Sequence, residues 1–254
     1  MNNVEDVGHH IVLAPEVLGY YGTFPITNTL LVSWIVMVIL IVLSIAATFR
    51  IKAIPSPLQN FFELIIESGY KTVEDLAGSQ KAKVFFPICF TFFLYIIVAN
   101  WLGLFPGIGT ITYKHAPLLR SINSDLNMTL ALALISAVTT HFLAIKYLGI
   151  FDYIKKWVSL NPILLFVGLL ELVSEVTKVV SLSFRLFGNI FAGEVVLTTV
   201  STILPFTAFL IPLPFYFLEI IVGFVQAAVF MMLTLVFMVL LSEKHGGEHS
   251  EAKH

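Results

Sequence analysis

Long apolar stretches limit what this chain can fold into more than any other feature. Residues 28–49 contain no charged side chain and supply the roughly 20 residues that a helix needs to cross a bilayer. Four further stretches are mainly apolar: 84–105, 126–147, 162–204 and 215–242. The chain is 58% hydrophobic and 12% charged, which is far from the composition of soluble domains. We therefore expect a single all-α polytopic membrane domain in which these five stretches cross the bilayer.

Residues 56–78 differ from these spans, because their apolar residues recur on one helical face only. Polar side chains such as Glu63, Glu67 and Lys71 fill the opposite face. Ser56 followed by Pro57 is typical of a helix start. The pattern predicts an amphipathic helix on the cytoplasmic surface of the membrane, not a crossing.

The stretch 162–204 is too long to stand upright in a membrane. No proline interrupts it after Pro162, and a helix of about 40 residues would be roughly 60 Å long. The hydrocarbon core is only about 30 Å thick, so the helix must tilt strongly, bend or run partly along the membrane. Pro205, Pro212 and Pro214 indicate a turn, after which 215–242 should return as the second arm of a tilted hairpin.

Lysine and arginine are distributed unequally between alternate loops. Ten of them lie in 50–83, 146–161 and 242–254, and two lie in 1–27, 106–125 and 201–215. Cytoplasmic loops are the ones enriched in positive charge. We expect an external N-terminal segment (1–27), an external loop (106–125) and a cytoplasmic tail (243–254).

Several classes of function receive no support from the sequence. A net charge of −2 gives no indication of nucleic-acid binding. The single cysteine, Cys89, excludes an internal disulfide and is interpreted as a packed small residue. The tail histidines, His245, His249 and His254, are interpreted as solvated, so we expect no metal and no cofactor. The N-terminus lacks the basic region of a cleaved signal peptide.

Arg185 is the residue hardest to explain by structure alone. It lies within the long stretch 162–204, and its guanidinium cannot lose its proton. Insertion scales put the cost of a mid-bilayer arginine at roughly 2.5–3.5 kcal/mol, and simulations put it at about 10–17. Water, an acidic partner or both must offset that cost, so a functional site is the default interpretation.

A helical wheel places a polar stripe on the Arg185 side of this helix. At about 100° per residue, the following lie within about 40° of Arg185: Glu171, Ser174, Lys178, Ser181 and Asn189. Glu175 lies about 80° away, and Glu194 lies about 180° away on the opposite face. On the last helix one face carries Glu219, Gly223, Gln226 and Phe230. Antiparallel pairing should bring the outer part of that face near Glu194.

Each of these residues also has a purely structural interpretation. Ser174 and Ser181 could allow close helix packing, Asn189 could form an inter-helix hydrogen bond, and Lys178 and Glu171 could reach the interface. Gly188 and Gly193 are interpreted as packing glycines, and His141 as a hydrogen-bonded core histidine. Glu194 and Glu219 are harder to explain in this way, because carboxyl groups without a function are rare in lipid.

Taken together, two sets of polar groups approach the middle of the membrane from opposite sides, with Arg185 between them. Protons can move along carboxylates and water but not onto arginine. The fixed positive charge repels cations and favours the ionised form of any carboxylate brought close. The two paths would be dead ends unless a mobile acidic partner connected them.

The segment from Ser181 to Glu194, SLSFRLFGNIFAGE, resembles the signature of the a subunit of F-type ATP synthases. Further matching motifs occur in the same order along the chain: Asn100 to Pro106, Ser124 to Thr129, Asn161-Pro162 and Gln226. The resemblance implies a stator subunit that loads and unloads protons on a rotating ring through two offset half-channels. It implies no catalysis by the chain itself.

The resemblance also implies roles for single residues. Arg185 would face the ring carboxylate and block a leak. The outer half-channel would contain Glu194, Glu219, Gln226 and Asn100. The cytoplasmic side would contain Asn189, Lys178, Glu171, Ser174 and Glu175. Glu219 is a histidine in some relatives, and two neighbouring glutamates would favour a shared proton. Val179 stands where many relatives have proline, which leaves a kink there in doubt.

The implied partners are the c-subunit ring, the b subunits of the peripheral stalk, the rest of the ATP synthase and the lipid bilayer. The expected location is a bacterial inner membrane, with an organellar energy-transducing membrane as the alternative. A secondary transporter with Arg185 binding an anion, and a structural membrane anchor, are the rival interpretations. The sequence leaves open H⁺ or Na⁺ as the coupling ion and the size of the ring.

Overall fold

The computed structural model describes residues 15–49, 57–105, 112–113, 116–117, 120–157, 162–203 and 212–243. The elements in order are β1 Val17–Tyr21, β2 Phe24–Thr27, α1 Asn28–Thr48, α2 Pro57–Gly103, β3 Thr112–Tyr113, β4 Ala116–Pro117, η2 Ile122–Ser124, α3 Leu126–Leu148, α4 Ile150–Trp157, α5 Pro162–Ile203 and α6 Pro212–Leu241. Among these described residues, α1, α2, α3, α5 and α6 are long and apolar enough to cross a membrane. The predicted all-α polytopic fold is confirmed.

Some predicted features cannot be compared with the structure. Ser56, Asn161, Pro205 and the tail histidines (His245, His249 and His254) lie outside the described residues. Most of the N-terminal segment 1–27 and parts of the loop 106–125 lie outside them as well.

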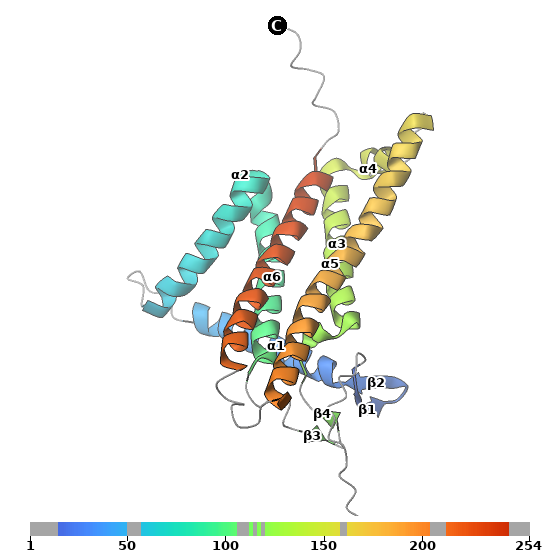
Figure 1. The fold of residues 1–254 in the computed structure, drawn as a ribbon. Coiled ribbons are helices and arrows are strands. Elements are labelled where there is room, and N and C mark those ends of the chain that lie inside the picture. The colour runs from blue at the N-terminus through green and yellow to red at the C-terminus, as the bar shows by residue number, and fades with distance from the viewer. Residues whose placement is uncertain are drawn as a thin grey trace, which may run out of the picture.

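The two ends of the helix bundle differ in what they carry (Figure 1). The antiparallel hairpins β1–β2 and β3–β4 lie at one end, here called the strand end. The helix α4, the bend in α2 and the end of α6 lie at the other, here called the α4 end. Helix α1 lies near the strand end and at an angle to the other long helices.

Short polar side chains fix where the helices begin at the strand end. The Thr27 hydroxyl accepts a hydrogen bond from the Leu30 N–H (3.3 Å), and the Asp125 carboxylate accepts one from the Asn127 N–H (2.9 Å). These are N-caps, which satisfy amides that have no partner inside the helix. The Thr29 hydroxyl also donates to Asp125 (2.9 Å), so the starts of α1 and α3 are tied together.

Helix α2 consists of two arms joined at Gly78, whose backbone is not helical (φ 75°, ψ 157°). The arms fold back on each other, as the edge-to-face contact between Tyr70 and Phe86 shows, with ring centroids 5.4 Å apart. The predicted amphipathic helix therefore starts at Pro57 and ends at Gly78, as expected. Its placement on the membrane surface stays a prediction. The second arm continues from this bend instead of starting at Val84.

The long helix α5 spans 42 residues without interruption, through Val179, and so matches the predicted stretch 162–204. The last helix begins earlier than expected. Pro212 and Pro214 were predicted to lie in a turn, whereas α6 starts at Pro212 and includes both. The first turn of a helix tolerates proline, because its N–H groups have no partner inside the helix.

The helices α2, α3, α5 and α6 share one apolar core, in which Ile96, Leu186 and Phe230 are fully buried. Two buried hydroxyl pairs cross this core: Thr129 with Ser183 (3.1 Å) and Ser136 with Thr234 (2.9 Å). Cys89 is fully buried in a second cluster, as its interpretation as a packed residue requires. Because α5 and α6 are held by this core, their polar side chains have fixed positions.

Candidate functional site

Arg185 lies on a face of α5 that the other described residues do not cover. Its side chain is exposed, and so are those of its neighbours Phe184 and Ser181. Within the described part of the chain Arg185 has no hydrogen bond or ion pair. The exposed face continues toward the start of the helix through Ser181 and Ser174, which share the Arg185 side of the wheel.

The polar stripe that the wheel predicts is divided by burial. Ser174, Ser181 and Asn189 are exposed, whereas Glu171 and Lys178 are half-buried. Lys178 Nζ lies 2.6 Å from Glu175 Oε1, and it lies over the Phe237 ring at 4.9 Å from the centroid. Toward the α4 end, the stripe therefore includes Lys178 and Glu175 as a close pair. Both side chains are half-buried and so point partly away from the exposed face.

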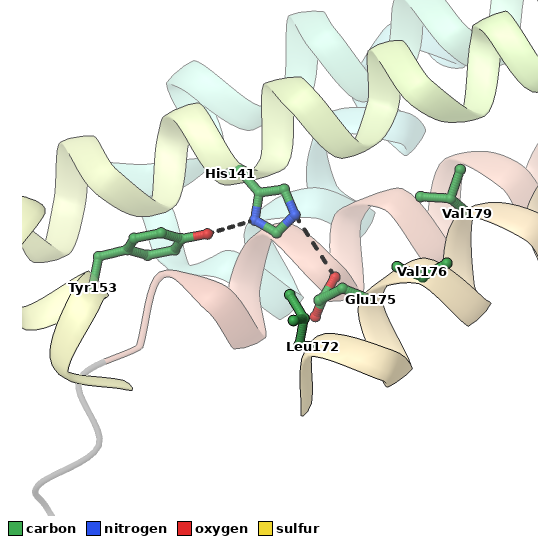
Figure 2. A pocket seen from close by; sticks show the side chains of 6 residues that line it. All are labelled: His141, Tyr153, Leu172, Glu175, Val176 and Val179. Carbon is green, nitrogen blue, oxygen red and sulfur yellow. Dashed lines mark hydrogen bonds and ion pairs between the residues drawn. The ribbon is translucent and has the colours of Figure 1, made fainter. Parts of the chain in front are cut away.

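His141 and Tyr153 join this pair from α3 and α4 (Figure 2). The Tyr153 hydroxyl lies 2.9 Å from His141 Nδ1, and His141 Nε2 lies 4.0 Å from Glu175 Oε2. A cavity of about 330 Å³ opens beside them, lined also by Leu172, Val176 and Val179. His141 does make a hydrogen bond, as predicted. It is not a core histidine, because its side chain is 30% exposed at the edge of this cavity.

Toward the strand end, α6 presents one buried polar face to α5 and α2. Glu219, Gly223, Gln226 and Phe230 are all buried, which confirms the face predicted from the wheel. The Asn100 side-chain amide donates to the Gly223 carbonyl (3.0 Å), and the Asn123 amide donates to Asn100 Oδ1 (2.6 Å). The second amide was not predicted, because Asn123 lies in η2, whose three residues are too few to show a period.

The carboxyl group of Glu219 sits directly against the backbone of Gly193. A methyl group built on Gly193 would collide with both carboxylate oxygens of Glu219. Glu194 is close enough to act on Glu219 electrostatically, and one of its own oxygens, Oε2, is buried without a hydrogen-bond partner among the described residues. The predicted approach of the α6 face to Glu194 is therefore seen, and the glycine leaves room for it.

Asn189 links the two ends of the site. Its side-chain amide donates to Gln226 Oε1 (2.8 Å), although sequence reasoning grouped Asn189 with the cytoplasmic residues and Gln226 with the outer ones. The Gln226 amide nitrogen is buried without a partner in the described residues. One helical turn beyond Arg185, the two predicted sets of residues are thus in direct contact.

The described residues hold no group of three or more His, Cys, Asp or Glu side chains that could bind a metal ion. The described side chains around Arg185 carry carboxyl, amide, imidazole and hydroxyl groups. Such groups can pass protons among themselves and through water.

An exposed cation on an apolar helix, with the buried carboxyl group of Glu219 beyond it, is typical of membrane proteins that translocate ions. The sequence matches the ATP synthase A chain family over residues 30–239, so the chain belongs to that family. The polar groups on α5 and α6 lie within the matched region.

Individual relatives agree with this assignment. ATP synthase subunit a of Citrifermentans bemidjiense is 36% identical over 210 residues, which is 81% of this chain and 83% of the relative. The subunit a of Geobacter sulfurreducens is 34% identical over 210 residues, with the same coverage of 81% and 83%. That of Syntrophobacter fumaroxidans is 32% identical over 237 residues, covering 92% and 91%.

Proposed function

We propose that the chain translocates protons through two offset half-channels and thereby couples a proton gradient to rotation of a c-subunit ring. Membership of the ATP synthase A chain family makes it an a subunit, the proton-translocating part of the stator. The observation that carries the proposal is the position of Arg185. It is exposed on a face of α5 that the described residues leave uncovered, between two groups of proton-exchanging side chains.

The outer half-channel in this proposal runs through Glu219, Glu194 and Gln226, with Asn100 in its wall. The contact of Glu219 with Gly193 and the bond from Asn189 to Gln226 support a continuous path from α6 to α5. Asn100 supports the wall by binding the Gly223 carbonyl. A proton taken up here neutralises the ring carboxylate, which can then turn into the lipid.

The cytoplasmic half-channel runs along the stripe toward the α4 end, through Glu171, Ser174, Glu175 and Lys178. Arg185 favours the ionised form of the arriving ring carboxylate and so promotes release of its proton. Its own fixed charge blocks direct passage between the half-channels. Asn189, beside Gln226, lies where the two paths come nearest to each other.

The partners follow from the same proposal. The uncovered face around Arg185 and Phe184 would contact the c ring, and the b subunits and the rest of the ATP synthase would bind elsewhere on the chain. The chain itself would catalyse no covalent step. Each charge that moves across the membrane provides about 2.3 kcal/mol per 100 mV, so several protons are needed for each ATP.

The test is ATP-driven proton pumping by the whole complex in inverted membrane vesicles. Arg185→Ala should abolish pumping, because the ring carboxylate would lose the charge that makes it release its proton. The matched control is Lys146→Gln, which removes an exposed cation at the end of α3 and should pump normally. Coupled pumping retained by Arg185→Ala would refute the proposal.

A further inference from the structure

His141, Glu175 and Tyr153 form a triad of neighbouring side chains. Glu175 belongs to the half-channel proposed above, whereas His141 and Tyr153 have no role in it. The triad joins three helices, since His141 is on α3, Tyr153 on α4 and Glu175 on α5 (Figure 2). Glu175 is only 12% exposed, and each of its oxygens faces a basic group. Oε1 is 2.6 Å from Lys178 Nζ, and Oε2 is 4.0 Å from His141 Nε2.

Two cavities meet at this triad. The larger one, of about 330 Å³, has room for several waters. The smaller one, of about 10 Å³, extends along α5 as far as Leu182, one turn before Arg185. His141, Glu175 and Val179 line both cavities. The imidazole and the carboxylate therefore stand between a roomy cavity and a narrow space that ends at Leu182.

We propose that His141 is a proton-relay residue that exchanges protons between water in the larger cavity and Glu175, with Tyr153 orienting its ring. This inference rests on the proposed proton translocation and adds a new entry point to its cytoplasmic side. The separation of 4.0 Å between Nε2 and Oε2 exceeds a direct hydrogen bond, so one water bridges the two atoms during transfer.

The relay step balances as a simple proton transfer. During pumping driven by ATP hydrolysis, a cavity water carrying an extra proton gives it to Nε2 of the neutral imidazole, whose Nδ1–H is donated to the Tyr153 hydroxyl, and the ring becomes imidazolium. The imidazolium then releases a proton from Nε2 through the bridging water to the Glu175 carboxylate, which becomes a carboxylic acid. During synthesis the same steps run in reverse. The Tyr153 hydroxyl at Nδ1 holds the ring so that Nε2 points to Glu175.

The titratable groups that line the two cavities with His141 come from α4 and α5. Among the described residues that line the two cavities, the titratable groups besides His141 are Tyr153 from α4 and Glu175 and Lys178 from α5. Helix α6 contributes only the apolar ring of Phe237, and α3 itself adds the hydroxyl groups of Ser136 and Thr140. Glu171, half-buried, lies one turn before Glu175 on α5.

The test measures ATP-driven pumping in inverted vesicles as the pH of the medium is varied, because the medium then bathes the cytoplasmic side. His141→Gln should slow pumping about tenfold near pH 8 and less than about twofold near pH 6, where water delivers protons directly. Tyr153→Phe keeps the aromatic ring and should shift the profile in the same direction by a smaller factor.

The matched control is Thr139→Val on α3, whose hydroxyl bonds only within its own helix to the Ile135 carbonyl (2.7 Å) and which should leave the profile unchanged. A purely structural role of His141 would lower the rate by the same factor at every pH, and that result would overturn the inference. So would profiles of His141→Gln and Tyr153→Phe that superimpose on the unmodified complex. Arg185→Ala is assayed beside them. If Arg185→Ala is inactive while His141→Gln pumps normally, the relay is refuted and the proposed function stands. If Arg185→Ala pumps, the proposed function itself is refuted.

Discussion

Gly193 shows how one missing side chain shapes the site. The sequence predicted that Gly193 is a packing glycine. It does allow a close approach, but the group that approaches is the carboxyl group of Glu219 and not the backbone of another helix. The sequence could not reveal this, because nothing in the periodicity of α5 specifies which residue of α6 lies opposite. The wheel did predict that Glu219 and Gln226 share a face, since both lie in one regular helix.

Gly193→Ala should disturb this contact directly. The new methyl group would have to displace the Glu219 carboxylate, and overpacking of this kind costs about 1–3 kcal/mol. We expect slower proton pumping and a lower thermal unfolding temperature of the purified complex. Gly19→Ala, in β1 and outside the face of α5 proposed to contact the ring, also has open space around its new methyl group and serves as the control. Equal behaviour of the two variants would show that Glu219 moves aside without cost.

At the scale of elements, regular helices were predictable and short irregular pieces were not. The bounds of α5 follow from a proline at its start and about 40 residues without another. The eight-residue helix α4 was missed, because it is too short to show a clear period. The hairpins β1–β2 and β3–β4 were missed for the same reason. Tyr153 lies on α4, so its contact with His141 could not be predicted either.

The bend of α2 depends on the backbone of Gly78. Its φ of 75° and ψ of 157° lie in a region open almost only to glycine, where other residues cost about 1–3 kcal/mol. Gly78→Ala should therefore destabilise the complex, which would be measured as a lower unfolding temperature. Gly78→Asn should be no better, because asparagine favours the left-handed helical region, where ψ is much smaller. The control is Ser79→Ala, at the exposed neighbouring position. If Gly78→Ala is as stable as this control, the bend does not depend on the glycine backbone.

At the scale of the molecule, the structure separates the two kinds of loop that the charge count distinguishes. The hairpins β1–β2 and β3–β4, in segments poor in lysine and arginine, lie at the strand end (Figure 1). The α2 bend, α4 and the end of α6, in segments rich in them, lie at the opposite end. We therefore expect the strand end to face outward and the α4 end to face the cytoplasm.

Single cysteines can test this orientation in a chain whose own buried Cys89 has been replaced by alanine. Tyr20→Cys, at a position 72% exposed in β1, should react with a membrane-impermeant maleimide added to intact cells. Glu243→Cys, just after α6 and also exposed, should react only in inverted vesicles. The reverse pattern would contradict the charge argument. If both cysteines are labelled from the same side, the chain crosses the membrane an even number of times. In that case α1 would be the helix that does not cross, since it lies at an angle to the others near the strand end (Figure 1).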